Sequence, residues 1–180
     1  MKKYLRFTAA VMATAIISTG LLCSVTAKAA DEKMESKSES KMSANDKKFV
    51  KKAYKGGLAE VANAKMAKDK AKNDATKELA DRMVTDHSKV NDKLMDIAKE
   101  ENMDLSKVEA KPASFSGDNF DKEYLMMLKK HHEKDIAMFE KEANDSGSKE
   151  DSDVVKLAKE TLPTLKEHLQ MVDEAIAKMK

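Results

Sequence analysis

Four long segments of this sequence repeat their apolar residues every three or four positions. They cover approximately residues 45–72, 74–102, 119–144 and 149–180. This spacing places the apolar side chains on one face of an α-helix. Helices of this length that each have one apolar face can bury those faces by packing against one another. The sequence therefore predicts an all-α protein with a four-helix bundle.

The connections between these segments differ in length. The first and second segments, and the third and fourth, are separated by only a few residues, which predicts two antiparallel hairpins. The connection over residues 103–118 is much longer and contains Pro112 and Gly117. It could cross the length of the bundle or form a loose loop, and the sequence leaves both open. Pro163 lies inside the last segment, where we expect it to kink or interrupt the helix.

The N-terminus has the organisation of a secretory signal peptide over residues 1–29. Basic residues precede an apolar stretch over residues 7–22, and a small-x-small cleavage site ends at Ala29. The apolar stretch is shorter than the roughly 20 residues of a membrane-spanning helix. We therefore expect an exported protein, periplasmic or otherwise extracytoplasmic, with no integral membrane segment after cleavage. Residues 30–44 are polar and aperiodic, which predicts a flexible tether before a bundle domain over residues 45–180.

Cys23 is the single cysteine of the chain. Lipid attachment uses a cysteine at the end of such an apolar segment, but lipoprotein signals have a small residue before it, and here that residue is Leu22. We therefore expect no lipid anchor. The mature chain would have no cysteine, which excludes a disulfide framework and thiol catalysis and suits an oxidising compartment.

Cleavage would also change the charge of the chain. The full sequence has 34 basic and 32 acidic residues. Removal of the signal peptide takes away four basic residues and no acidic one, which leaves 30 basic against 32 acidic side chains. Neither a polybasic patch nor a tryptophan remains to indicate a nucleic-acid partner.

One residue in each apolar stripe is polar. These residues are Glu60, His87, His132 and His168. Each lies within about three positions, or roughly 5 Å of rise, of the middle of its predicted helix. Residues at mid-helix meet at one level of a bundle whether neighbouring helices run parallel or antiparallel. The sequence therefore predicts that one carboxylate and three imidazoles converge in the core.

Burial of these groups without partners would be costly. A divalent cation would remove that cost, because imidazole and carboxylate are ordinary ligands of zinc, iron, manganese and copper. Asp135 lies one turn after His132 and could orient its ring. His131 falls on a neighbouring face, which favours a histidine at the rim or surface. A single inward histidine is more often a hydrogen-bonded core residue, so a polar layer without metal is the alternative.

The sequence also resembles a known family, the exported bacterial family catalogued as domain of unknown function 4142. The resemblance extends over about residues 45 to 178 and is carried by the segments GGLAEVANAKMA (56–67), LADRMVTDHSKVNDKL (79–94), FDKEYLMMLKKHHEKDIAMFEKEA (120–143) and TLPTLKEHL (161–169). The family is regarded as ferritin-like, so the resemblance implies a helical bundle with a role in metal binding. The family's motif positions fall on Glu60, His87, His132 and His168.

The pattern departs from that of di-iron carboxylate bundles, which use Glu-x-x-His pairs. The residues three positions before the inward histidines are Val84, Lys129 and Leu165. Only one glutamate faces inward, so one metal ion is favoured over a two-iron centre. His132 and Glu133 begin like a zinc-protease motif, but position 136 is isoleucine and the motif fails.

We therefore expect an exported, ferritin-like bundle that binds one divalent metal ion in its core and serves metal handling or envelope stress protection. The alternative is a non-enzymatic structural or interaction bundle whose buried polar layer fixes helix register without a metal. A metalloenzyme with an open coordination position is a third hypothesis, which four protein ligands would argue against. No catalytic residue and no substrate follow from the sequence.

Overall fold

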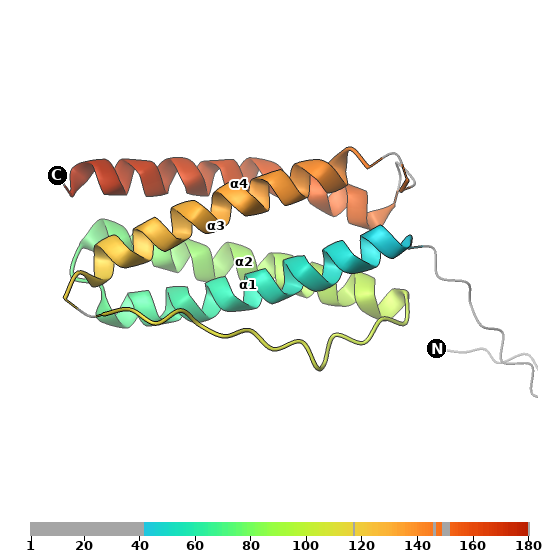
Figure 1. The fold of residues 1–180 in the computed structure, drawn as a ribbon, viewed down its shortest axis with the longest axis horizontal. Helices are drawn as coiled ribbons and strands as arrows, with labels where there is room; N and C mark the ends of the chain where they lie inside the picture. Colours follow the sequence, from blue (N-terminus) through green and yellow to red (C-terminus); the bar gives the residue numbers. More distant parts are fainter. Residues whose placement is uncertain (1–41, 117, 146, 149–151, 180) are drawn as a thin grey trace, which may run out of the picture. The chain divides into compact units, whose positions relative to one another are not determined.

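The computed structural model describes residues 42–116, 118–145, 147–148 and 152–179, and the predicted signal peptide, Cys23 and tether as far as residue 41 lie outside them. Within the described residues, four helices pack as the predicted bundle (Figure 1). They are α1 (Ala44–Lys70), α2 (Asp74–Glu100), α3 (Phe120–Ala143) and α4 (Asp153–Lys178).

The bundle begins with the first residues that the structure describes. Met42 is buried in the core. Ser43 caps α1, because its hydroxyl accepts a hydrogen bond from the backbone N–H of Asp46 while the Asp46 carboxylate accepts one from the N–H of Ser43. Such reciprocal bonds satisfy amide groups that the first turn of a helix leaves without partners. The helix therefore starts at Ala44, one residue before the predicted boundary.

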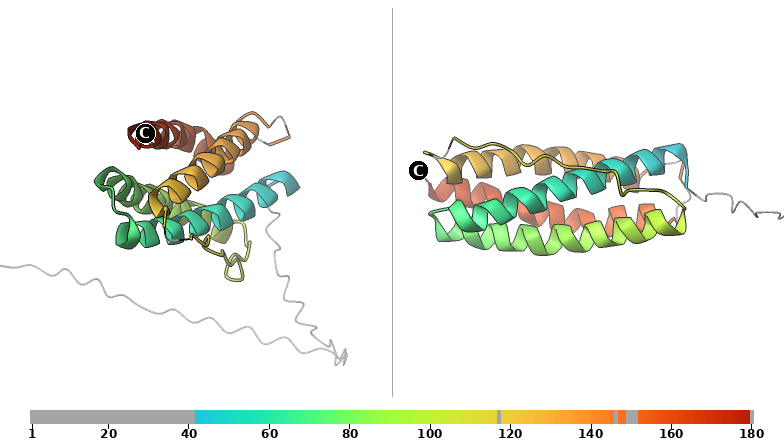
Figure 2. Two further views of the ribbon diagram at one scale, coloured as in Figure 1. Left: turned by 60° about the vertical axis from the view of Figure 1, so that its left-hand side comes forward. Right: turned by 90° about the horizontal axis from the view of Figure 1, so that it is seen from below.

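The long connection between α2 and α3 crosses the length of the bundle (Figures 1 and 2). Leu105 packs in the core near the end of α2. The N–H of Ala113 then donates to Oδ1 of Asn63 on α1 at 2.7 Å, and Phe115 packs against Phe120 at the start of α3. The structure thus decides between the two alternatives that the sequence left open. The short connections make α1–α2 and α3–α4 antiparallel pairs, and one long crossover is the arrangement of ferritin-like bundles.

The buried apolar side chains form two clusters, one toward each end of the bundle. The first core cluster consists of Met42, Phe49, Val50, Ala53, Leu94, Ala98, Leu105, Phe139, Val154, Leu157, Ala158 and Leu165. The second core cluster consists of Ala64, Ala67, Ala71, Leu79, Ala80, Met83, Phe120, Tyr124, Leu125, Leu128, Val172 and Ala175. On every helix, a buried polar residue lies between the members of the two clusters. None of the helices in the described part of the chain is long and apolar enough to cross a membrane.

Pro163 does not interrupt α4, which continues through it from Asp153 to Lys178. Proline lacks a backbone N–H and normally disfavours a helix interior. Ala158 and Leu165 are buried on either side of the proline. Packing therefore holds both parts of the helix in place. The expected interruption is wrong, and a kink at Pro163 stays a prediction.

Candidate metal centre

Each helix of the bundle contributes one buried polar residue at the same level. Glu60 comes from α1, His87 from α2, His132 from α3 and His168 from α4. Their relative exposures are 1%, 6%, 0% and 1%, so all four are core residues. The structure brings these residues together as their mid-helix positions predicted.

The three histidines offer nitrogen atoms to one point, and we call them the histidine trio. One ring nitrogen from each of His87, His132 and His168 lies within 4.8 Å of the other two. Nε2 of His132 is 3.3 Å from Nδ1 of His168. Two nitrogens bound to one tetrahedral zinc at about 2.0 Å are themselves about 3.3 Å apart. The spacing of that pair already suits a shared metal ion.

Glu60 contacts the outer nitrogens of two members of the trio. Its Oε2 atom is 3.0 Å from Nδ1 of His87, and its Oε1 atom is 3.5 Å from Nδ1 of His132. A proton on Nδ1 of His87 is thereby donated to a carboxylate, which leaves Nε2 with its lone pair free. Metal-binding histidines are commonly oriented by carboxylates in this way. Glu60 therefore lies behind the ring of His87, and its predicted role as a fourth ligand stays a prediction.

Asp86 orients the third histidine and was missed in the sequence analysis. Its Oδ2 atom lies 3.1 Å from Nε2 of His168 and also accepts a hydrogen bond from Arg82. Nη2 of the same guanidinium group donates a hydrogen bond to Oε2 of Glu167 on α4 at 3.1 Å. Asp86 directly precedes His87 and follows Arg82 by one helical turn, and this spacing is the signal that could have identified it.

Asp135 does not make the contact that was expected of it. In the described part of the chain, Nδ1 of His132 lies 3.1 Å from the carbonyl of Leu128, and its Nε2 lies beside His168. Asp135 instead lines a cavity together with Glu60 and His131. His131 is half-buried at that rim, with Nδ1 3.9 Å from Oε1 of Glu60.

The electrostatics of the centre favour neutral imidazoles. Burial, followed by the neighbouring histidines, lowers the pKa of His87 well below its ordinary value, and burial lowers the pKa of His132 to about 4. Burial also lowers the pKa of His168, although Asp86 opposes the shift. Burial and the nearby Asp135 raise the pKa of Glu60 well above its ordinary value. Near neutral pH, the three rings therefore keep the lone pairs that a metal ion requires.

Within the described part of the chain, several buried polar atoms around the centre have no hydrogen-bond partner. They include Nε2 of His87, Oε1 of Glu60 and Oδ1 of Asn91. These three residues line a small enclosed cavity of about 20 Å³. Buried polar atoms almost always have a partner, which is protein, water or an ion. The trio and its surroundings therefore fit a bound cation with a water-sized space beside it.

Gly57 makes room for Asn91 at this level of the bundle. A Cβ atom at Gly57 would lie 2.1 Å from Oδ1 of Asn91, whereas a Cβ atom at Gly56 would meet nothing within 4 Å. Of the two glycines, only Gly57 therefore makes room for the side chain of Asn91.

The fold and the site define a class of protein: a four-helix bundle with one crossover and a buried histidine trio held by two carboxylates. Within this class, the chain belongs to the family described as Domain of unknown function (DUF4142), whose family model matches residues 31–175. The resemblance drawn from the sequence is thereby confirmed. Comparison with curated proteins and with solved structures gave no match. The description of the family names no activity, so the function has to be argued from the site.

Proposed function

We propose that this protein is an exported metal-binding bundle that holds one divalent metal ion between His87, His132 and His168. The observation that carries the proposal is the grouping of three buried imidazole nitrogens within 4.8 Å of one another. Glu60 and Asp86 would orient the rings from opposite sides. Because the ligands come from three different helices, a bound ion would also link the helices of the bundle.

The donor set narrows the choice among the four candidate metals. Three neutral imidazoles suit zinc, copper and iron, whereas manganese prefers oxygen ligands. A tetrahedral ion would have one remaining position. Glu60 or a water molecule in the small cavity could occupy that position. This arrangement supports metal handling as the role.

A polar layer without metal is the second candidate, and one observation favours it. Nε2 of His132 and Nδ1 of His168 are within hydrogen-bonding distance of each other, and His168 also reaches Asp86. These hydrogen bonds could fix the register of α2, α3 and α4 without a metal ion. Metal content therefore separates the two candidates.

The test is to purify the chain from the periplasm without chelator and to measure its metal content by mass spectrometry. We expect about one metal ion per chain in the wild type and in His131→Ala, and almost none in His132→Ala. His131→Ala is the matched control because it removes the adjacent half-buried ring and leaves the trio intact. Far-UV circular dichroism establishes that His132→Ala is folded. Absence of metal, together with no thermal stabilisation by zinc, iron, manganese or copper, would support the polar layer instead.

Export is a separate part of the proposal. We expect the protein in the extracytoplasmic fraction of fractionated cells, with an intact mass that corresponds to a chain beginning after Ala29. A full-length mass, or recovery with the cytoplasmic fraction, would contradict it.

A further inference from the structure

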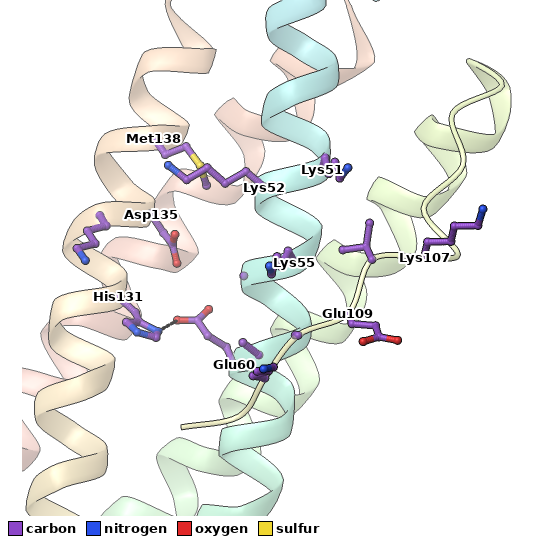
Figure 3. A pocket seen from close by; sticks show the side chains of 15 residues that line it. Lys51, Lys52, Lys55, Glu60, Lys107, Glu109, His131, Asp135 and Met138 are labelled. Carbon is purple, nitrogen blue, oxygen red and sulfur yellow. Dashed lines mark ion pairs between the residues drawn. The ribbon is translucent and has the colours of Figure 1, made fainter. Parts of the chain in front are cut away.

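A large cavity of about 710 Å³ lies beside the metal centre, between α1, α3 and the crossover segment (Figure 3). This is a size at which proteins commonly bind small molecules. Its basic lining residues are Lys51, Lys52, Lys55, Lys107, Lys111 and Lys134, and its acidic ones are Glu60, Glu109 and Asp135. All of these lysines are exposed, whereas Glu60 is buried. We call this feature the lysine-rimmed cavity.

The inner end of the lysine-rimmed cavity reaches the metal centre through Glu60. Figure 3 shows Glu60 facing His131 across this end, with Oε1 of Glu60 3.9 Å from Nδ1 of His131. Among the described residues, this buried oxygen has no hydrogen-bond partner. The other oxygen of the same carboxyl group lies 3.0 Å from Nδ1 of His87. A ligand that enters the cavity therefore meets a carboxyl group that also contacts the histidine trio.

The six lysines at the rim outnumber the three carboxyl groups of the cavity lining, although the charges of Lys52 and Lys134 act on Asp135. Among the described residues, none of its six lysines has a carboxylate oxygen within ion-pair distance. Elsewhere on the bundle, lysines do form such pairs, as Lys93 does with Glu160 at 3.0 Å and Lys166 with Glu140 at 2.8 Å. The rim lysines are therefore available to a ligand that carries negative charge.

The two ends of the cavity favour ligand groups of opposite charge. A free metal cation would be repelled by the lysines at the rim, and a free anion would meet the carboxyl groups of Glu60 and Asp135 at the inner end. A compact complex of a metal ion with a polycarboxylate satisfies both, because its carboxylates can face the lysines while its metal faces Glu60. A charged rim of this kind also raises the rate of association of oppositely charged ligands.

We propose that the lysine-rimmed cavity receives the metal ion as an anionic complex with a small polycarboxylate and passes it to the histidine trio. This inference rests on the proposed function. The transfer is a ligand exchange: metal–oxygen bonds to the polycarboxylate break as metal–nitrogen bonds to the trio form. No electron is transferred, and the polycarboxylate leaves with the negative charge that it brought.

The experiment follows the loading of metal-free protein from two zinc sources, zinc citrate and zinc chloride. Zinc bound per chain is measured at successive times after rapid desalting. The cavity variant is Lys55→Gln with Lys107→Gln, and its matched control is Lys65→Gln with Lys122→Gln, which changes two exposed lysines outside the cavity lining. We expect the cavity variant to load from zinc citrate about tenfold more slowly, and to load from zinc chloride at least as fast as the wild type. The control should match the wild type with both sources.

The outcomes separate this inference from the proposed function. If the wild type takes up zinc from neither source, this inference is overturned. The proposed function fails with it only if iron, manganese and copper also neither bind nor stabilise the protein. If zinc loads through His132 but the cavity variant behaves like the wild type with zinc citrate, this inference alone is overturned. Calorimetric titration with citrate and with phosphate, each without metal, tests whether the cavity binds anions alone. Binding of either anion as tightly as zinc citrate would show a simple anion site and would also overturn the inference.

Discussion

The two carboxylates on either side of the histidine trio have opposite surroundings. Asp86 is partly exposed and accepts hydrogen bonds from both Arg82 and His168. Glu60 is buried, contacts His87, and has one oxygen atom without a hydrogen bond. We refer to these surroundings as the Asp86 flank and the Glu60 flank.

The pKa values of the two carboxyl groups follow from this difference. Burial raises the pKa of Asp86, but the hydrogen bonds from Arg82 and His168 outweigh burial and leave it below its ordinary value. Burial raises the pKa of Glu60 too, and the neighbouring Asp135 adds to the rise. An unsatisfied polar group in a core lowers stability. The Asp86 carboxylate is therefore satisfied by hydrogen bonds within the protein, whereas the Glu60 flank keeps an unsatisfied oxygen atom that lowers the stability of the bundle.

Metal affinity should distinguish the flanks most strongly. We expect Glu60→Gln to weaken metal binding about 10- to 100-fold, the usual effect of losing a carboxylate that orients a ligand. Asp86→Asn should have a smaller effect, because water and Arg82 already screen its charge. Affinity is measured by competition with a chelator of known strength. An equal or larger loss in Asp86→Asn would contradict the difference between the flanks.

The stability of the metal-free protein should fall in Asp86→Asn but not in Glu60→Gln. Asp86→Asn loses charge-assisted hydrogen bonds to Arg82 and His168, so we expect the free energy of unfolding to fall by about 1–2 kcal/mol. Glu60→Gln removes a buried ionisable group, and glutamine can still accept from His87, so stability should stay unchanged or rise. Urea denaturation with chelator present measures both. If Glu60→Gln were the more destabilised variant, the Glu60 flank would have a structural role as well.

The adjacent glycines of α1 test the packing of the Glu60 flank. Gly57→Ala would place a Cβ atom 2.1 Å from Oδ1 of Asn91, so we expect a loss of roughly 1 kcal/mol or more. Gly56→Ala is the matched control and should stabilise the helix by up to about 1 kcal/mol, because its Cβ atom would meet nothing. Thermal denaturation compares the two. Stabilisation by both substitutions would mean that the position of Asn91 beside the trio is not required for packing.

Glu142 supplies a reference for a buried carboxyl group far from the trio. Burial, followed by the nearby Asp46, raises its pKa to about 7. The folded protein therefore keeps this proton at pH values where the unfolded chain has released it. Stability from this group should be complete below the ordinary glutamate pKa and should be lost as the pH rises through about 7.

Between pH 5 and pH 8, we expect the melting temperature of metal-free Glu142→Gln to gain about 2–4 °C relative to that of the wild type. The buried histidines contribute the opposite slope, but they contribute it equally to both proteins. Scanning calorimetry at both pH values measures the difference. Parallel pH profiles for the variant and the wild type would assign the pH dependence to other groups, with those of the Glu60 flank as the first to test.

The sequence predicted the centre well because its residues follow from helical periodicity. The positions of Glu60, His87, His132 and His168 in the apolar stripes were sufficient to place them in the core at one level. Asp86 was missed because it lies beside the inward stripe of α2 and gains its role only when α4 brings His168 within 3.1 Å. The partner of Asp135 was misjudged for a related reason: the ring of His132 turns to the carbonyl of Leu128 on its own helix.

By itself, the sequence determined the class of the fold and the composition of the polar layer, since both depend on spacings along single helices. Only the tertiary structure decided that the long connection crosses the bundle, that Glu60 lies behind His87, and that lysines from α1, α3 and the crossover line one cavity. These features depend on how separate elements are placed side by side. Periodicity fixes which face of a helix turns inward, but packing between helices determines which atoms meet there.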